Sequence, residues 1–350
     1  MKKLARLTCA LFGAYACAAA AQSSNVVLFG TLDVTARYVK ADGQDRRFSE
    51  AMDGINSSQL GIRGTEDLGG GLKAGFTLLS AINADSGTAN VKFWNRRSTV
   101  SLLGNFGEIR LGRDYIPTFW NFGLYDAFGV VGLGATANVR QMYGGTRMDN
   151  AISYILPATL GGFYGQAMAA AGEGGASGDR PGRHIGARFG YAAGPLDIGV
   201  VAAQQRFAVT TPIVPTGGVI ASAGSTQKTL NVGASYDFGP AKLMGYIDRE
   251  TLLGHKENTW SLSGIIPFGQ SEIHAGYDRS TLKLASGTST TVDQFKATYV
   301  YNLSKRTAIF TTVAHLDNKD ASRVTLPGAA GPTTASGQSV GAEFGLRHFF

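Results

Sequence analysis

Cysteine is nearly absent from this 350-residue chain, because Cys9 and Cys17 are the only two and both lie within the first 21 residues. The rest of the chain therefore has no disulfide framework, no thiolate nucleophile and no cysteine metal site. Charged residues are scarce too, at 16% against roughly 25% in typical soluble domains. With this composition, one large closed sheet is a better prediction than two soluble domains.

Long apolar runs and basic clusters are also missing. No internal stretch approaches the roughly 18 uncharged apolar residues that a transmembrane helix needs, and no run of Lys or Arg indicates nucleic-acid binding. The five histidines are scattered without metal-ligand spacing, and no nucleophile–base pair stands out. We therefore expect no enzyme, no cofactor, no metal and no nucleic acid. The histidines are His184, His255, His274, His315 and His348.

The first 21 residues have the pattern of a signal peptide. A basic start with Lys2, Lys3 and Arg6 precedes a short apolar run over residues 7–18, and small residues follow at 19–21. We expect cleavage after Ala21, which leaves residues 22–350 as one domain and lowers the formal net charge from +7 to +4. A transmembrane anchor is one alternative, but the apolar run is too short for it and no stop-transfer flank follows. A lipoprotein site at Cys17 is another, but Ala14 stands where such sites usually have Leu.

The chain is rich in glycine, with 48 residues, and it has a period of two. Segments of roughly ten residues alternate apolar with polar or small side chains and are cut by turn signals. In 26–38 the even positions are mostly apolar, whereas Thr31, Asp33, Thr35 and Arg37 occupy the other face. The same alternation recurs in 59–65, 72–79, 97–111, 184–191, 230–238, 294–301 and 340–350.

Each such strand has an apolar face and a wet face, since successive side chains point to opposite sides of a sheet. No helical segment is long enough to cover the apolar faces, and soluble monomers do not expose apolar patches of that size. If those faces meet lipid and the sheet closes on itself, every backbone group is still satisfied. The alternation thus predicts an all-β transmembrane barrel with a polar, water-filled interior.

Tight turns alternate with longer polar connections along the chain. Seven tight turns and eight long connections predict sixteen antiparallel strands, with both termini on the short-turn, periplasmic side. A barrel of this size leaves an aqueous channel. The tight turns lie near 67–70, 105–107, 159–161, 193–195, 238–240, 268–270 and 303–305, and the long connections at 41–56, 83–92, 115–148, 172–182, 207–226, 251–257, 283–291 and 318–337.

Several motifs resemble the Gram-negative general porins of β-proteobacteria: "VVLFGTLDV", "LGIRGTEDLGGGLKAGF", "NRRSTVSLLGNFGEIRLGRD", "NVGASYDFGPAKL", "NLSKRT" and the terminal "FGLRHFF". The resemblance covers essentially the whole chain after the signal segment. It implies a 16-stranded trimeric barrel in the outer membrane, with anion selectivity in several members. It also implies that the third long connection, about 115–148 with Asp126 and Arg140, folds inward and forms the pore constriction.

A pore selects ions by the charges that ring its narrowest part. Alternation supplies cations on inward faces, with Arg113 where the third loop begins; the inward ones are Arg37, Arg63, Lys73, Arg97 and Arg110. The resemblance directs attention to Gln59, to the pair Arg96 and Arg97, and to Arg140. Simple alternation turns Arg97 inward and Arg96 toward lipid, unless a bulge shifts the register. The expected constriction set is Arg37, Gln59, Arg63, Arg96, Arg97, Arg110, Arg113, Asp126 and Arg140.

Gln59 departs from the resemblance, because related porins often place Arg there. A neutral amide removes one positive charge, so we expect a weaker anion preference than in strongly basic relatives. Any single arginine can instead brace the wall through a salt bridge, as Arg37 with Asp33 or Arg110 with Glu108. The two roles stay open at this point.

We expect an outer-membrane porin for passive diffusion of small hydrophilic solutes and ions. The alternative within this reading is a substrate-specific channel, which the aromatic residues of the third loop leave open. A catalytic barrel or an adhesin is a less supported class. Expected partners are two further copies of the chain, outer-membrane lipids including lipopolysaccharide, small anions, and the barrel-insertion machinery, which would read a terminal strand ending in Phe350.

Overall fold

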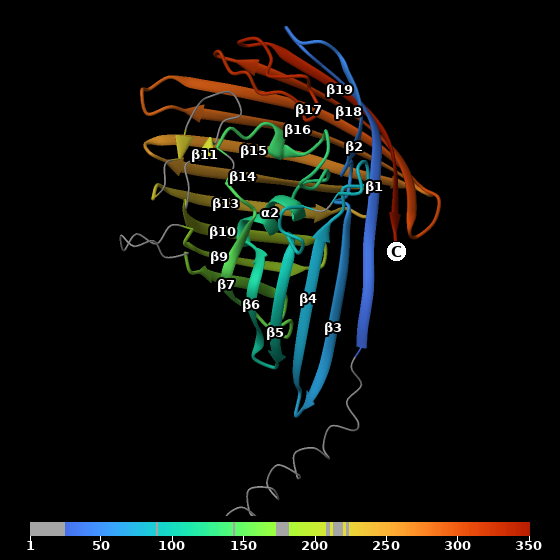
Figure 1. Cartoon of the computed structure of the whole chain (residues 1–350), viewed down its shortest axis with the longest axis vertical. Helices are drawn as coiled ribbons and strands as arrows, with labels where there is room; N and C mark the ends of the chain where they lie inside the picture. Colours follow the sequence, from blue (N-terminus) through green and yellow to red (C-terminus); the bar gives the residue numbers. More distant parts are fainter. Residues whose placement is uncertain are drawn as a thin grey trace, which may run out of the picture.

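The computed structural model describes residues 25–88, 90–142, 144–172, 182–207, 211–212, 220–221 and 224–350. These residues form one antiparallel sheet that curls into a barrel, with a separate pair of two-residue strands (Figure 1). The expected signal segment lies outside the described residues. No helix in the described part of the chain is long and apolar enough to cross a membrane.

The barrel wall consists of long strands that each pair with their neighbours in chain order. They are β1 Asn25–Ala41, β2 Arg47–Met52, β3 Gln59–Gly69, β4 Leu72–Ala81, β5 Arg97–Gly104, β6 Gly107–Tyr115, β7 Arg147–Ile155, β8 Phe163–Ala170, β9 His184–Ala193, β10 Leu196–Arg206, β13 Thr226–Asp237, β14 Lys242–Leu252, β15 His255–Phe268, β16 Ser271–Lys283, β17 Ser289–Asn302, β18 Thr307–Lys319 and β19 Gln338–Phe349. The remaining elements are α2 Pro117–Leu124, the short 3-10 turn η1 Thr136–Asn138, β11 Thr211–Pro212 and β12 Ile220–Ala221.

The barrel closes where the last strand pairs with the first. Thr31 lies opposite Phe349 and Ala41 opposite Ser339, so β1 and β19 are in register over eleven residue pairs. The terminal Phe350 continues this edge, because its backbone exchanges hydrogen bonds with Gly30. Closure leaves no open strand edge in the described wall, which is the condition for a sheet to sit in lipid.

The second wall strand is interrupted. β2 pairs with the loop-side half of β1, β3 pairs with the other half, and both run antiparallel to β1. Residues 53–58 leave the wall between them, so β2 and β3 count as one interrupted strand and the described wall has sixteen strands. The sequence predicted a plain loop over 41–56, which misses both β2 and this interruption.

The two faces of the wall differ as the period of two predicts. In β13, Leu230 is 52% exposed on the outer face, whereas Asn231 beside it is fully buried on the inner face. Val232 and Tyr236 continue the exposed apolar row, and Ser235 continues the buried polar one. The hydrophobic side chains thus lie outside and the polar ones inside, the reverse of a soluble protein.

The seven tight turns lie where the sequence predicted them, and several require glycine. Gly69, Gly70 and Gly71 between β3 and β4 all have positive φ values, which side chains with a Cβ rarely adopt. One of the long connections was predicted wrongly. β14 ends at Leu252 and β15 begins at His255, so the connection expected over 251–257 is a two-residue turn instead.

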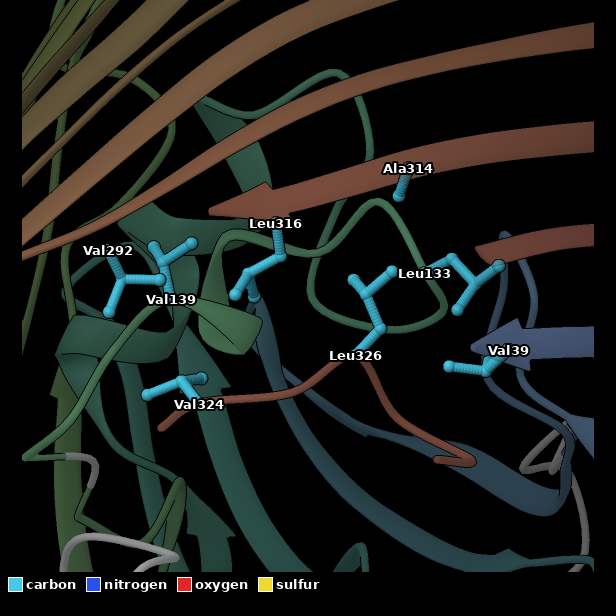
Figure 2. Packing of buried hydrophobic residues seen from close by; sticks show 8 residues of the cluster. All are labelled: Val39, Leu133, Val139, Val292, Ala314, Leu316, Val324 and Leu326. Carbon is cyan, nitrogen blue, oxygen red and sulfur yellow. The ribbon is translucent and has the colours of Figure 1, made fainter. Parts of the chain in front are cut away.

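Two loops fold into the barrel and pack on each other. The third loop, residues 116–146, connects β6 to β7, and the eighth loop, residues 320–337, connects β18 to β19. Figure 2 shows their apolar side chains meeting residues of β1, β17 and β18 in one buried cluster, which consists of Val39, Leu133, Val139, Val292, Ala314, Leu316, Val324 and Leu326. The inward third loop was expected, but the eighth loop was taken for an ordinary surface connection.

Candidate functional site

The third loop begins with a short helix that lies against the inner wall. Pro117 occupies the first turn of α2, where its fixed φ suits a helix start and its missing N–H costs nothing. The helix contacts β8, β9, β10 and β13, and Figure 1 shows it inside the ring of strands. The Asn121 amide donates to the carbonyl oxygen of Gly199 at 3.1 Å and to Asn231 Oδ1 at 2.9 Å. These bonds fix the helix to the wall.

Tyr125, at the end of this helix, makes a second attachment. Its hydroxyl donates to Asp197 Oδ1 at 2.8 Å and lies 2.7 Å from the hydroxyl of Tyr164. Burial, together with the hydrogen bonds to Tyr164 and Asp197, raises the pKa of Tyr125 well above its ordinary range. The phenol therefore stays protonated and remains a donor at physiological pH.

Asp126 fastens the middle of the loop to the opposite part of the wall. Its carboxylate accepts a hydrogen bond from Lys296 Nζ of β17 at 3.0 Å and one from Thr136 Oγ1 at 2.6 Å. Lys296 also pairs with Asp278 of β16 at 2.8 Å, and all three charged side chains are 0% exposed. Asp126 was expected among the constriction charges, but the structure buries it as an anchor of the loop.

Arg140 anchors the far end of the loop in the same way. Its guanidinium pairs with Glu250 and lies 3.4 Å from Asp248, both on β14. The same group lies over the ring of Phe122, 4.2 Å from its centroid. With only 2% of its side chain exposed, Arg140 is neutralised and shielded and does not face the channel.

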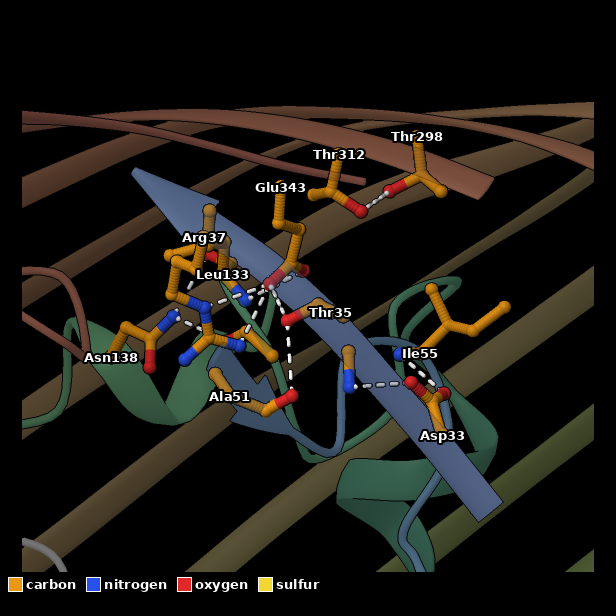
Figure 3. A network of polar contacts seen from close by, with 12 residues as sticks. Asp33, Thr35, Arg37, Ala51, Ile55, Leu133, Asn138, Thr298, Thr312 and Glu343 are labelled. Carbon is orange, nitrogen blue, oxygen red and sulfur yellow. Dashed lines mark hydrogen bonds and ion pairs between the residues drawn. The ribbon is translucent and has the colours of Figure 1, made fainter. Parts of the chain in front are cut away.

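Arg37 is the third buried cation. Its Nη2 lies 2.7 Å from Glu343 Oε2 of β19, and the backbone N–H of Leu133 in the third loop donates to the other oxygen of the same carboxylate at 3.5 Å. Figure 3 shows this network, in which Thr35 also donates to Glu343. The bracing partner expected for Arg37 was Asp33, which is wrong, because Asp33 is engaged elsewhere.

The carboxylate of Asp33 holds the 53–58 segment against the inside of the wall. It accepts hydrogen bonds from three successive backbone N–H groups, those of Gly54, Ile55 and Asn56, at 3.0, 3.0 and 2.7 Å. The third loop touches this segment at Gly132, where a Cβ would lie 1.8 Å from the carbonyl oxygen of Gly54. The loop and the 53–58 segment thus meet and narrow the barrel from one side.

Close to the 53–58 segment, the inner face of β5 and β6 carries two arginines, Arg97 and Arg110, which share two carboxylates. Arg97 Nε lies 2.6 Å from Asp114 Oδ1, and Arg110 contacts both Asp114 at 2.7 Å and Glu108 at 2.8 Å. Arg97 also lies over the rings of Tyr115 and Trp120. The expected brace between Arg110 and Glu108 is present, and the expected inward direction of Arg97 is confirmed.

Arg96 points inward as well, contrary to simple alternation. Its Nη2 lies 3.3 Å from Asp53 Oδ2 and 3.3 Å from the carbonyl oxygen of Ser58. The reason is that β5 begins only at Arg97, so the period of two does not extend to the preceding residue. Both Arg96 and Arg97 thus point into the barrel, where Arg96 contacts the 53–58 segment.

Arg113 lies on the outer face, away from the other expected residues. It pairs across the sheet with Ser98, which pairs in turn with the outward Leu78. Its guanidinium contacts the carbonyl oxygen of Asn95 at 2.7 Å and Asp149 at 2.5 Å. The structure therefore removes Arg113 from the group around the channel.

Arg63 and Gln59 lie on the inner face of β3. Gln59 pairs with the inward Thr31 and is half-buried. Arg63 is exposed, lies over the ring of Phe29 at 5.1 Å, and has no ion pair with any carboxylate in the described ranges. Among the expected cations, Arg63 is therefore the one whose charge is least neutralised by carboxylates.

Comparison with known proteins identifies the fold and the family together. The Gram-negative porin family model matches residues 7–321. The outer membrane porin protein 32 of Delftia acidovorans is 39% identical over 95% of this chain and 96% of its own length. An anion-selective porin from Comamonas acidovorans superimposes with a TM-score of 0.82 at 36% identity, covering 94% of this chain and all of that one.

The chain belongs to the Gram-negative porin family.

The more distant similarities show the fold alone. OmpT of Vibrio cholerae is 16% identical and superimposes with a TM-score of 0.69 over 93% of this porin. The structure and the comparisons together establish that this porin is a sixteen-stranded barrel. The family match and the nearer relatives establish that it belongs to a family of channel proteins and not of enzymes. Its place is the outer membrane, where its relatives are found. Within the described ranges no three His, Asp or Glu side chains group as metal ligands.

Two inward arginines of this porin were not singled out by the sequence. Arg347 of β19 donates to Asn56 Oδ1 at 3.1 Å and to Asn302 Oδ1 at 3.4 Å, and it lines a cavity of about 300 Å³ beside the third loop. Arg188 of β9 donates to Asn121 Oδ1 at 2.6 Å. Among the described residues neither forms an ion pair within 4 Å, although the carboxylates of Asp33 and Glu272 lie near enough to Arg347 to interact with its charge. Alternation turned both inward, but only the path of the loop shows that they lie beside it.

Proposed function

We propose that this porin forms a water-filled channel through which small hydrophilic solutes and ions diffuse passively, with a weak to moderate preference for anions. The observation that carries the proposal is a difference between two groups of cations around the third loop: in one group carboxylates neutralise the charge, and in the other they do so only in part. Lys296, Arg140 and Arg37 are buried against carboxylates. On or beside β3, β5 and β6, four arginines are in contact with only three carboxylates, and Arg63 among them is exposed and has no ion pair in the described ranges.

The strands β3, β5 and β6 supply an excess of positive charge to the channel. Arg63, Arg96, Arg97 and Arg110 lie on or beside β3, β5 and β6, and the acids that contact them are Asp53, Glu108 and Asp114. Arg188 and Arg347 add two cations that are held by neutral amides. In a narrow passage such fixed charges act on a passing ion more strongly than on an open surface. The excess is positive and modest, which suits a weak preference.

The sign of the selectivity is the direct test. The zero-current potential across a planar bilayer under a KCl gradient is expected to have the sign of chloride preference. A potential of the opposite sign, that of potassium preference, would contradict the proposal. Gln59 is expected to keep the preference small, because it places an amide on the inner face of β3 beside the 53–58 segment.

A substrate-specific channel is the second candidate, and one cluster favours it. Tyr115 stacks on Phe119 at 4.2 Å, Trp120 lies 5.8 Å from Tyr115, and Arg97 and Arg147 flank the rings. Aromatic faces with adjacent guanidinium groups suit a planar anionic solute. Liposome swelling with solutes of graded size distinguishes the two candidates, because a general pore sorts solutes by size and charge only.

Assembly and export complete the proposal. We propose three copies per assembly, lipopolysaccharide among the surrounding lipids, and removal of residues 1–21 before insertion. We further propose that the insertion machinery reads the terminal strand. The ring of Phe350 is 41% exposed and lies against Gly30, where a Cβ would come within 2.2 Å of it. N-terminal sequencing, crosslinking of detergent-solubilised protein and deletion of Phe350 test these points separately.

A further inference from the structure

A band of positive charge runs along the outside of the barrel at the long-loop ends of β13 to β18. Six cationic side chains alternate with the outward apolar residues of these strands: Lys228, Arg249, Lys256, Arg279, Lys283 and Lys319. Only two acids of these strand ends share this face, Asp293 and Asp317. A positive excess thus faces away from the channel, where it does nothing for ions passing inside.

The strand register brings three of the lysines into one row. Lys256 lies directly opposite Lys283, and Thr251 separates it from Lys228 on the other side. Adjacent strands are about 4.8 Å apart, so the row spans three strand spacings. Like charges directly opposite each other destabilise a sheet. In the described ranges none of the three lysines has an ion pair, so the sheet leaves this repulsion uncompensated.

The nearby acids are engaged by other groups. Asp293 is contacted by Arg279 at 2.6 Å, by Lys319 at 2.6 Å and by the hydroxyl of Tyr277 at 2.7 Å. Asp317 lies 4.0 Å from Lys319. In the described ranges no carboxylate of the wall therefore pairs with the lysine row, defined as Lys228, Lys256 and Lys283. An external anion can bind to it.

Aromatic residues mark the depth of the row in a membrane. Trp260 of β15 lies four residues from Lys256 toward the tight-turn end, and its ring is 5.0 Å from that of Tyr277, which is 4.7 Å from Phe295. Such outward rings sit at the boundary between hydrocarbon and headgroups. Four residues of strand span about 13 Å, so the lysine row lies at the level of the outer-leaflet headgroups.

An apolar trough lies beside the row on the same outer face. Its floor consists of Ala167, Ala187 and Ala202, which are cross-strand neighbours on β8, β9 and β10, and Lys228 stands at its edge. The trough has a volume of about 770 Å³. Small side chains between larger apolar neighbours leave a depression that an acyl chain can fill.

We propose that this face binds the phosphorylated glycolipid of the outer leaflet. Its phosphates lie on the lysine row and one of its acyl chains lies in the alanine trough. Charge complementarity selects a phosphorylated headgroup, because the lysine ammonium group donates strong, charge-assisted hydrogen bonds to phosphate oxygens. Each surface lysine adds about 1 kcal/mol to the binding of an anionic lipid. The inference rests on the proposed membrane partner and specifies where it binds.

The test uses the folded, full-length mature porin in detergent and measures the dissociation constant of bis-phosphorylated lipid A. The variant Lys256→Gln/Lys283→Gln is expected to weaken binding about 10- to 30-fold, and each single variant about fivefold. The matched control is Lys305→Gln/Arg306→Gln, which removes two charges from the tight turn between β17 and β18. The control is expected to bind like the wild type.

Dephosphorylated lipid A is expected to bind the wild type as weakly as the double variant binds the phosphorylated form. Inorganic pyrophosphate is expected to bind far more weakly than lipid A, because it lacks chains for the trough. Equal affinity of the wild type and the double variant, or of the two lipid forms, would overturn the inference. Pyrophosphate binding as tight as that of lipid A would overturn it as well.

Single-channel conductance in glycolipid-free bilayers separates this inference from the proposed channel. The double variant is expected to conduct like the wild type, since the lysines face outward. Normal conductance with unchanged lipid A affinity would contradict the inference alone. A wild type without conductance would contradict the channel function whatever its lipid affinity.

Discussion

Lys296 of β17 and Asp126 of the third loop lie 3.0 Å apart, and neither side chain has any exposed surface. A second carboxylate, that of Asp278, lies 2.8 Å from the same ammonium group. One buried cation thus holds two buried anions, and one of these anions belongs to the loop that narrows the channel. Removing a partner from such a group leaves charge uncompensated in the interior.

Loss of Lys296 should therefore be more damaging than loss of Asp126. Lys296→Met leaves two buried carboxylates without a cation and is expected to lower the free energy of unfolding by about 3–5 kcal/mol. Asp126→Asn keeps the Lys296–Asp278 pair and is expected to cost less. Denaturant unfolding in detergent, with Lys305→Met in a tight turn as the control, measures both. A smaller loss for Lys296→Met than for Asp126→Asn would contradict this prediction.

The close approach of the third loop to the 53–58 segment predicts an effect of a single methyl group. Gly132 has a φ of +79°, and a Cβ there would lie 1.8 Å from the Gly54 carbonyl oxygen. Gly132→Ala should push the loop away from the segment and raise the variance of single-channel current. Gly129→Ala is the matched control, because Gly129 has a φ of +66° and nothing lies within 4 Å of its Cβ position. Equal current noise in both variants would show that the contact does not position the loop.

Gln59 is the residue through which the strength of selectivity should be adjustable. Gln59→Arg adds a charge to the inner face of β3, next to the 53–58 segment that Arg96 contacts. The chloride-to-potassium permeability ratio is expected to rise about sevenfold, because a unit charge about 7 Å away in a water-like medium favours chloride and disfavours potassium by on the order of 0.6 kcal/mol each. Reversal potentials measure this ratio, and Gln59→Glu should move it the other way. If the permeability ratio is the same in both variants as in the wild type, Gln59 lies outside the ion path.

Much of the barrel follows from the sequence alone. Alternation of the kind seen at Leu230 and Asn231 fixes which face of each strand meets lipid, because the side-chain period of a strand is two. The same rule turned Arg63, Arg97 and Arg110 inward. Glycine-rich turns such as that at Gly69 set the hairpin ends, where only a left-handed backbone fits.

The partners of the inward charges do not follow from alternation. Arg140 pairs with Glu250, and Lys296 with Asp126, across separations of more than 100 residues that only the path of the third loop determines. Motif resemblance marked Arg140 and Asp126 as important but gave no sign that both are buried. Arg96 was turned outward by a rule that holds only inside a strand.

The eighth loop was missed for a related reason. Val324 and Leu326 lie in a polar stretch rich in glycine and threonine, with no periodic pattern to mark a buried face. Their burial depends on Leu133 and Val139 of the third loop, to which they bring apolar surface inside the barrel. A contact between two irregular segments leaves no signal in either segment by itself.

Two arginines at the same end of the wall test the origin of selectivity, because each pairs with an aspartate but only one faces the channel. Arg97 points inward beside Asp114, and Arg113 lies on the outer face beside Asp149. Arg97→Gln and Arg113→Gln remove the same charge from opposite sides of the sheet. The zero-current potential under a KCl gradient should show the chloride-to-potassium permeability ratio falling about sevenfold for Arg97→Gln, because the lost charge acts on both ions with opposite sign, and unchanged for Arg113→Gln. An unchanged potential for Arg97→Gln, or an equal loss in both variants, would contradict selectivity by the inward cations.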